Sequence, residues 1–296
     1  MIEAAIAVMN GKGGTLKTSI TANVGGLAAA GGYRVLLVDL DPQGNLARDL
    51  GYGPRSDGGA GLLMAMYHAS EPPRLTVRDN LDVIPGGARL ADWPGISFGR
   101  YSRSDGSLGT ALARVLEPLA AHYDLLLVDT PPGEQTLQRQ AAVTARWVVI
   151  PTAADDASLD GMVRVAELFH QVAGENARLE LLGVVLTRVG SSARAIRRQA
   201  REKIVAEFGG EDVLFETVIR DSHRTAVDCR TRGQLVYEYE EAVIAQQPYW
   251  DARRSGLQRE PLAESARGLA ADYAALTKEI LTRRLDAARC VTEIVK

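Results

Sequence analysis

The chain has 296 residues, of which 46% are hydrophobic and 24% are charged, so it is long and apolar enough to bury a sizeable core. Its formal net charge of −3 excludes a protein that attracts nucleic acid through a global positive field. The two cysteines, Cys229 and Cys290, form no metal-binding or redox motif, and no uninterrupted apolar run reaches membrane-spanning length.

The first predicted unit is a strand, a glycine-rich turn and a helix. The apolar run at residues 4–9 has strand length, and a helical pattern of apolar residues ends at Gly31. Between them lies the string GKGGTLKTS at residues 11–19. Glycines let the backbone close around an anion, and the helix N-terminus adds unpaired N–H groups. The spacing therefore predicts a phosphate-binding loop, with Lys17 on the β- and γ-phosphates and the Thr18 hydroxyl on Mg²⁺.

A second buried strand is expected at residues 33–39, and it ends in the string DLDPQGN at residues 39–45. Carboxylates at the carboxyl end of a parallel strand, here Asp39 and Asp41, face the ligand crevice. The same residue types also favour a plain turn, and these residues alone do not separate the two interpretations.

The next stretch, around residues 52–107, reads as a less regular insertion with surface loops. A short helix is expected at 62–68 and a strand at 81–85, whereas residues 93–101 show no clear period. After a helical pattern at 108–122, an apolar strand ends in Asp129, followed by Thr-Pro-Pro. An aspartate at this point holds magnesium in P-loop enzymes.

Strands and helices then alternate along the rest of the chain. We expect strands at 147–151, 181–187 and 213–219, and helices at 158–172, with Ser158 as N-cap, at 193–208 and around 261–290. This alternation predicts a single α/β domain over residues 1–296. Its core would be a doubly wound, mostly parallel sheet with helices on both faces.

One face of the helix at 193–208 carries four arginines at spacing i, i+3, i+4, i+7. They are Arg194, Arg197, Arg198 and Arg201. A solvated helix face explains them, with Glu202 partly neutralising the charge. A binding site for DNA phosphates explains them too, since phosphates would relieve the repulsion between like charges.

Together the motifs resemble those of the ParA/MinD family of P-loop ATPases. The string KGGTLKT at residues 12–18 resembles the family's deviant Walker A motif. The string at 39–45 resembles its switch I, and DTPP at 129–132 resembles its switch II. The three motifs occur in the family's order, and the resemblance extends to about residue 275.

The resemblance implies a site for ATP and Mg²⁺ with defined residue roles. The catalytic residues would be Lys17, Asp41, which positions or activates the attacking water, and Lys12, which reaches across from the second subunit of a dimer. The metal site would consist of Thr18, Asp39 and Asp129. The nucleotide-binding residues would be Gly11, Lys12, Gly13, Gly14, Thr15, Leu16, Lys17, Thr18 and Ser19 in the loop, and Thr187, Arg188, Ile219, Arg220 and Asp221 around the nucleoside.

The resemblance also implies a function in DNA partition. ATP would close a homodimer, the dimer would bind non-specific DNA through the four arginines, and a ParB-like centromere-binding protein would stimulate ATP hydrolysis. We expect a cytoplasmic, nucleoid-associated protein without a membrane partner, because the last helix lacks the Phe and Trp of an interfacial anchor. Two alternatives stay open: a MinD-like membrane-cycling spatial regulator, and a nucleotide-dependent binding module with little turnover.

Leu16 departs from the phosphate-loop pattern, which has glycine before the lysine. Either the backbone keeps the leucine at negative φ, or the leucine is left-handed and stores about 1–3 kcal/mol of strain. We predict the loop with negative φ, because it lets Lys17 and Thr18 reach the phosphates at less cost.

Overall fold

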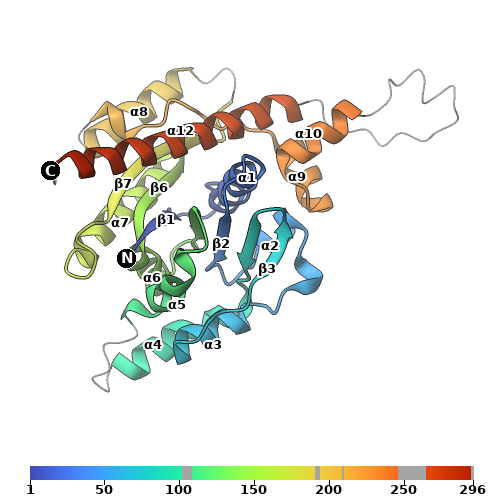
Figure 1. The fold of residues 1–296 in the computed structure, drawn as a ribbon. Helices are drawn as coiled ribbons and strands as arrows, with labels where there is room; N and C mark the ends of the chain where they lie inside the picture. Colours follow the sequence, from blue (N-terminus) through green and yellow to red (C-terminus); the bar gives the residue numbers. More distant parts are fainter. Residues whose placement is uncertain (102–108, 191–193, 209, 246–264, 295–296) are drawn as a thin grey trace, which may run out of the picture.

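The computed structural model describes residues 1–101, 109–190, 194–208, 210–245 and 265–294. Its centre is a sheet of seven strands (Figure 1). The strands are β1 (Ile2–Val8), β2 (Val35–Asp39), β3 (Leu75–Arg78), β4 (Leu81–Ile84), β5 (Leu125–Asp129), β6 (Ala145–Ala153) and β7 (Glu180–Thr187). They lie in the order β3-β4-β2-β5-β1-β6-β7, and all neighbours run parallel except β3, which pairs antiparallel with β4.

Helices cover both faces of the sheet, and each face buries its own apolar cluster. One face is covered by α3 (Ala60–His68), α4 (Trp93–Tyr101), α5 (Ala111–Ala120), α6 (Gln135–Thr144), α7 (Asp156–Val172) and α8 (Arg194–Phe208). The other is covered by α1 (Lys17–Ala30), α2 (Leu46–Leu50), α9 (His223–Arg232), α10 (Val236–Ala245) and α12 (Ala266–Ile294). The predicted doubly wound α/β fold is confirmed.

Two central strands place acidic side chains next to each other. β2 and β5 are buried along their whole length, as expected for strands with helices on both sides. Their register pairs Asp39 with Asp129 at the last position of each strand. Two of the predicted metal-binding residues therefore meet at the carboxyl edge of the sheet.

The expected strand at 213–219 is wrong. This segment begins with a 3₁₀ turn, η4 (Glu211–Val213). Leu214 then forms an isolated bridge with Val184 of β7, and Arg220 forms one with Val189, just after β7. Between the bridges, a carboxylate from α12 takes the backbone N–H groups: Glu279 accepts from Glu216 at 2.9 Å and from Thr217 at 3.1 Å. These N–H groups are thus unavailable to a regular ladder.

Other boundaries differ from the sequence prediction. Residues 93–101, which showed no period, form α4, and the insertion supplies the β3–β4 edge of the sheet together with η1 (Gly53–Arg55) and η2 (Ala88–Asp92). Helix α7 is capped by Asp155 and not by Ser158, because the Asp155 side chain accepts from the Ser158 N–H at 2.9 Å. The last helix begins at Ala266, and residues 261–264 of the expected range lie outside the described residues.

Candidate nucleotide and magnesium site

The loop between β1 and α1 is held in shape by other parts of the protein. Asn10 is fully buried; its Nδ2 donates to the Pro151 carbonyl oxygen at 2.9 Å, and its Oδ1 accepts from the Lys12 N–H at 2.8 Å. Further along the loop, the Thr187 hydroxyl donates to the Thr15 carbonyl oxygen at 3.4 Å. The loop is therefore anchored to both β6 and β7, as a preformed anion cradle requires.

Leu16 occupies the last position before α1, and our prediction of its backbone conformation is wrong. It has φ 67° and ψ 23°, in the left-handed region. Its carbonyl oxygen accepts from the Ile20 N–H at 2.8 Å, and its side chain packs against the apolar cluster beneath α1. The helix start thus needs this backbone conformation, and leucine adopts it at a cost of about 1–2 kcal/mol.

The two lysines of the loop lie in different surroundings. Lys17 is 6% exposed, and its Nζ donates to the Lys12 carbonyl oxygen at 2.8 Å. Burial lowers the pKa of Lys17, and the charges of Asp129 and Asp41 oppose that shift. The Lys12 side chain is not part of the cavity lining; its Nζ lies 3.2 Å from Asp155, and both side chains are about half exposed.

The paired acids at the sheet edge have few hydrogen bonds. Asp39 and Asp129 are both fully buried. Asp39 Oδ1 accepts from the Asp41 N–H at 2.9 Å, but Asp39 Oδ2 and both oxygens of Asp129 have no hydrogen-bond partner in the described structure. Burial raises the pKa of Asp129 to about 7, and burial together with the neighbouring Asp129 raises the pKa of Asp39.

These residues fit a hard divalent cation. Buried carboxylate oxygens without donors are unfavourable unless a positive charge joins them, and Mg²⁺ prefers oxygen ligands. The Thr18 hydroxyl lies close enough to Asp129 to oppose the rise in the pKa of that carboxyl, although it does not complete a hydrogen bond to it, so the third predicted metal-binding residue lies beside the acids. The residues that would hold Mg²⁺ are therefore together.

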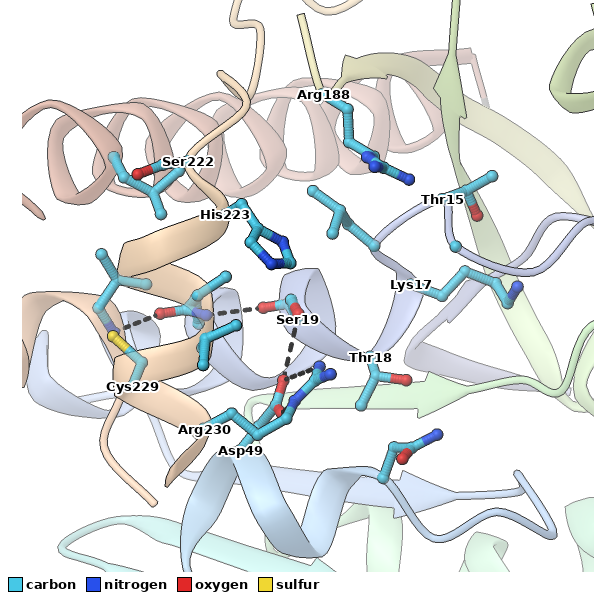
Figure 2. Close-up of a pocket in the computed structure, with 18 of the residues that line it drawn as sticks. Thr15, Lys17, Thr18, Ser19, Asp49, Arg188, Ser222, His223, Cys229 and Arg230 are labelled. Atoms are coloured by element: carbon cyan, nitrogen blue, oxygen red, sulfur yellow. Dashed lines mark hydrogen bonds and ion pairs between the residues drawn. The ribbon is translucent and has the colours of Figure 1, made fainter. Parts of the chain in front are cut away.

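The phosphate loop opens into a cavity of about 650 Å³ (Figure 2). Residues from Gly13 to Ser19 line one side, and Asp41 lines it while its Oδ1 accepts from the Gln43 N–H at 2.9 Å. Gly11 is not part of the lining; its N–H donates to the Gly161 carbonyl oxygen at 3.1 Å. The volume is typical of a small-molecule site.

The predicted nucleoside residues divide into two groups. Arg188, Arg220 and Asp221 line the cavity. Thr187 and Ile219 are fully buried and do not line it: Thr187 anchors the loop, and Ile219 belongs to the apolar core.

Helices α2 and α9 also contribute to the cavity, although the sequence did not predict this. Ser222 and His223 line it, as do Cys229 and Arg230. Asp49 accepts from the Ser19 hydroxyl at 3.2 Å and from Arg230 Nε at 2.8 Å, so it joins α1, α2 and α9 (Figure 2). No local motif marks these residues, because the pairs join positions far apart in the chain.

The four arginines proposed to bind DNA all belong to α8. Arg198 is 79% exposed at its side chain and lies 3.8 Å from Glu202, and Arg201 is exposed. The side chains of Arg194 and Arg197 lie outside the described part. Neither Arg198 nor Arg201 lines the cavity.

Comparison with known proteins decides the family. A family model described as an AAA domain matches residues 3–181. The chromosome partitioning protein ParA of Caulobacter vibrioides is 32% identical over 260 residues, which cover 86% of this chain and 94% of that protein. The chain belongs to the ParA/MinD family of P-loop ATPases. Its sequence motifs had predicted this membership.

Solved structures of ParA/MinD-type proteins have the same fold. Apo McdA from Cyanothece gives a TM-score of 0.71 at 21% identity, covering 94% of this chain and 98% of that chain. MinD from Pyrococcus horikoshii gives 0.64 at 23% identity, covering 93% and 95%. Across the described residues of this chain, no helix has both the length and the apolar character that a membrane span needs.

Proposed function

We propose that this ParA/MinD-family chain is an ATP-hydrolysing switch that acts in DNA partition. ATP and Mg²⁺ stabilise a homodimer, the dimer binds non-specific DNA, and a ParB-like partner stimulates hydrolysis and release. The names of two similar proteins support this: the Caulobacter relative is a chromosome partitioning protein, and the Pyrococcus MinD is complexed with Mg-ADP.

The observation that carries the proposal is a buried lysine beside carboxylate oxygens that lack partners. Lys17 opens α1 within electrostatic reach of Asp129 and Asp41. Three oxygens of Asp39 and Asp129 have no donor among the described residues. A purely structural role leaves these oxygens unexplained, whereas a site for a phosphate chain with its divalent cation uses both the lysine and the acids.

Each residue of the site has a separate role in ATP hydrolysis. Lys17 and the N–H groups at the start of α1 bind and neutralise the phosphate oxygens. Asp41 orients the attacking water: its Oδ1 is engaged by Gln43, and its Oδ2 remains for the water. Thr18, Asp39 and Asp129 would hold Mg²⁺, which would further neutralise the phosphate charge. When the dimer closes, Lys12 of a second copy leaves its ion pair with Asp155 and binds the phosphates of the nucleotide.

The test combines ATP binding, light scattering and phosphate release on one preparation. The wild-type protein should bind Mg-ATP, dimerise with it and release phosphate, faster with DNA and its partner. Lys17→Ala should lose ATP binding, and with it dimerisation and DNA binding. Dimers that still form with ATP in this variant would contradict the assignment of the loop.

Asp41→Ala separates hydrolysis from binding. This variant should bind ATP and form the DNA-bound dimer, but it should not release phosphate, because no carboxylate orients the water. Wild-type turnover in Asp41→Ala would remove Asp41 from the mechanism. If the wild-type protein binds ATP but releases no phosphate even with DNA and partner, the chain is a nucleotide-dependent binding module.

A further inference from the structure

Three arginines occur in the described lining of the cavity, and they differ in their partners. Arg220 donates to Asp272 through Nε at 2.6 Å and Nη2 at 2.8 Å. Arg230 donates to Asp49 through Nε at 2.8 Å. Arg188 is exposed and has neither a hydrogen bond nor an ion pair with any described side chain. Its positive charge is therefore not neutralised by the part of the protein that the structure describes.

Arg188 extends from the end of β7 toward the phosphate loop (Figure 2). Its Nη1 lies 3.8 Å from the position that a Cβ atom on Gly14 would occupy. The preceding residue, Thr187, is hydrogen-bonded to the Thr15 carbonyl oxygen. The base of the arginine and the loop that it faces are thus fixed relative to each other.

The backbone of Arg188 is held in an unfavourable conformation. Its φ of 56° lies in the left-handed region, which costs a residue with a Cβ atom free energy. Both neighbours are fixed: Thr187 binds the loop, and the Val189 N–H donates to the Ile219 carbonyl oxygen at 3.3 Å. Backbone strain held in place by fixed neighbours is typical of functional sites.

We propose that Arg188 binds the phosphate chain of the nucleotide, in the same subunit as the loop that it faces. This inference rests on the proposed function, since it requires a nucleotide in the cavity. A guanidinium presents a planar fork of donors that matches phosphate oxygens. Gly14 belongs to the loop whose backbone cradles those oxygens. The role therefore differs from the nucleoside contact that the family resemblance implied for Arg188.

Calorimetric titration of wild type and Arg188→Asn with ATP and with GTP, each with Mg²⁺, tests the proposal. Asparagine tolerates the left-handed conformation, so the fold should be kept while the charge is removed. We expect both nucleotides to bind roughly tenfold to a hundredfold more weakly, because a hydrogen bond to a charged group is lost. The ratio of ATP to GTP affinity should not change, because both nucleotides carry the same triphosphate.

Two further variants complete the test. Arg188→Lys should recover part of the affinity, since it keeps the charge but not the fork. Arg178→Gln is the matched control for loss of one positive charge, because Arg178 pairs with Glu3 near the amino end of β1. This variant should bind both nucleotides normally. Arg188→Gly, which also permits φ 56°, replaces the asparagine variant if that one unfolds.

Two results would overturn the inference. One is an ATP affinity in Arg188→Asn within twofold of wild type. The other is a loss for ATP without a matching loss for GTP, which would indicate contact with the base. Either result leaves the proposed function standing if the wild-type protein binds ATP. Absence of ATP binding in the wild-type protein would reject the proposed function as well.

Discussion

Strain is concentrated at the candidate site. Among the described residues, four that are not glycine have positive φ, and two of these, Leu16 and Arg188, line the cavity. Leu16 directly precedes the first turn of α1, and Arg188 extends from the end of β7 toward the phosphate loop. Both are held by hydrogen bonds of their own backbone or of their neighbours. The fold therefore bears the cost of this geometry before any nucleotide binds.

The strain at Leu16 can be measured by comparing two small substitutions. Leu16→Ala and Leu16→Gly both remove the side-chain packing, but only glycine avoids the left-handed penalty. We expect the free energy of unfolding of Leu16→Gly to exceed that of Leu16→Ala by about 1 kcal/mol, in urea titrations.

A helical position gives the matched control for Leu16. Ala28→Gly, inside α1, should lower the free energy of unfolding by about 0.5–1 kcal/mol, because glycine is unfavourable in a helix interior. If Leu16→Gly is also less stable than Leu16→Ala, the leucine is not strained.

At the scale of residues, the sequence predicts chemistry better than conformation. The types and spacing of Lys17, Asp39 and Asp129 were enough to bring them to one edge, because a parallel sheet places the ends of β1, β2 and β5 together. The link from Asp49 to Arg230 could not be predicted, since it joins positions 181 residues apart with no motif at either. The φ of Leu16 depends on the start of α1, which the residue type does not reveal.

The beginnings of β2 and β5 are joined by an ion pair with a pH-dependent effect. Arg34 donates to Asp124 through Nη2 at 2.8 Å and through its backbone N–H at 2.9 Å, and these bonds lower the pKa of Asp124 to about 2. A carboxyl group with a lowered folded-state pKa stabilises the fold above its unfolded-state pKa of about 3.9, and the effect is lost as the pH falls toward 2.

Asp124→Asn should therefore lower stability near neutral pH, and its deficit relative to wild type should shrink between about pH 4 and pH 2. Urea titrations at a series of pH values measure this deficit. The pair sits at the surface, so the effect should be small. In a double-mutant cycle with Arg34→Gln, the coupling energy should fall with pH in the same range. A coupling that stays constant down to pH 2 would contradict the assignment.

The two hydrogen bonds that join Glu279 of α12 to the segment after η4 should stabilise the fold. Glu279→Ala leaves the N–H groups of Glu216 and Thr217 without their acceptor, so we expect a loss of about 1–2 kcal/mol in the free energy of unfolding. Hydrogen exchange at these two amides should accelerate. Lys278→Ala, at the exposed neighbouring position, should change neither quantity.

At the scale of elements, strands that are apolar throughout were predicted well, and segments defined by distant partners were not. The run that forms β5 is buried on both faces and reads as a strand from its sequence alone. The segment 213–219 reads the same way locally, but Glu279 removes the two N–H groups that a regular strand would need. Local patterns contain no information about a carboxylate about sixty residues away.

For the whole molecule, the net charge of −3 means that attraction to DNA must be local. Reversing Arg197 and Arg198 to Glu should weaken DNA binding without affecting ATP-driven dimerisation, because Arg198 and Arg201, the α8 arginines whose side chains the structure describes, do not line the cavity. The dependence of DNA affinity on salt should become shallower, since fewer counterions are released. Fluorescence anisotropy with labelled DNA at several salt concentrations measures both quantities.

Arg289→Glu provides the control for this experiment, because Arg289 is a similarly exposed arginine on α12. It should bind DNA like the wild-type protein. Unchanged DNA affinity in the α8 variant would assign those arginines to an ordinary solvated helix face.

The segment that Glu279 holds also protects the sheet from pairing with other molecules. It runs along the outer side of β7, where the Phe215 and Ile219 N–H groups donate to Val184 and Leu186 at 2.9 Å. The N–H groups of Glu216 and Thr217 in this segment are occupied by Glu279, so a strand from another chain finds no continuous row of donors there. At the opposite edge, β3 is only four residues long, and short edge strands are poor templates for pairing. Protection at both edges lowers the risk that the folded protein seeds β-aggregates when it is concentrated.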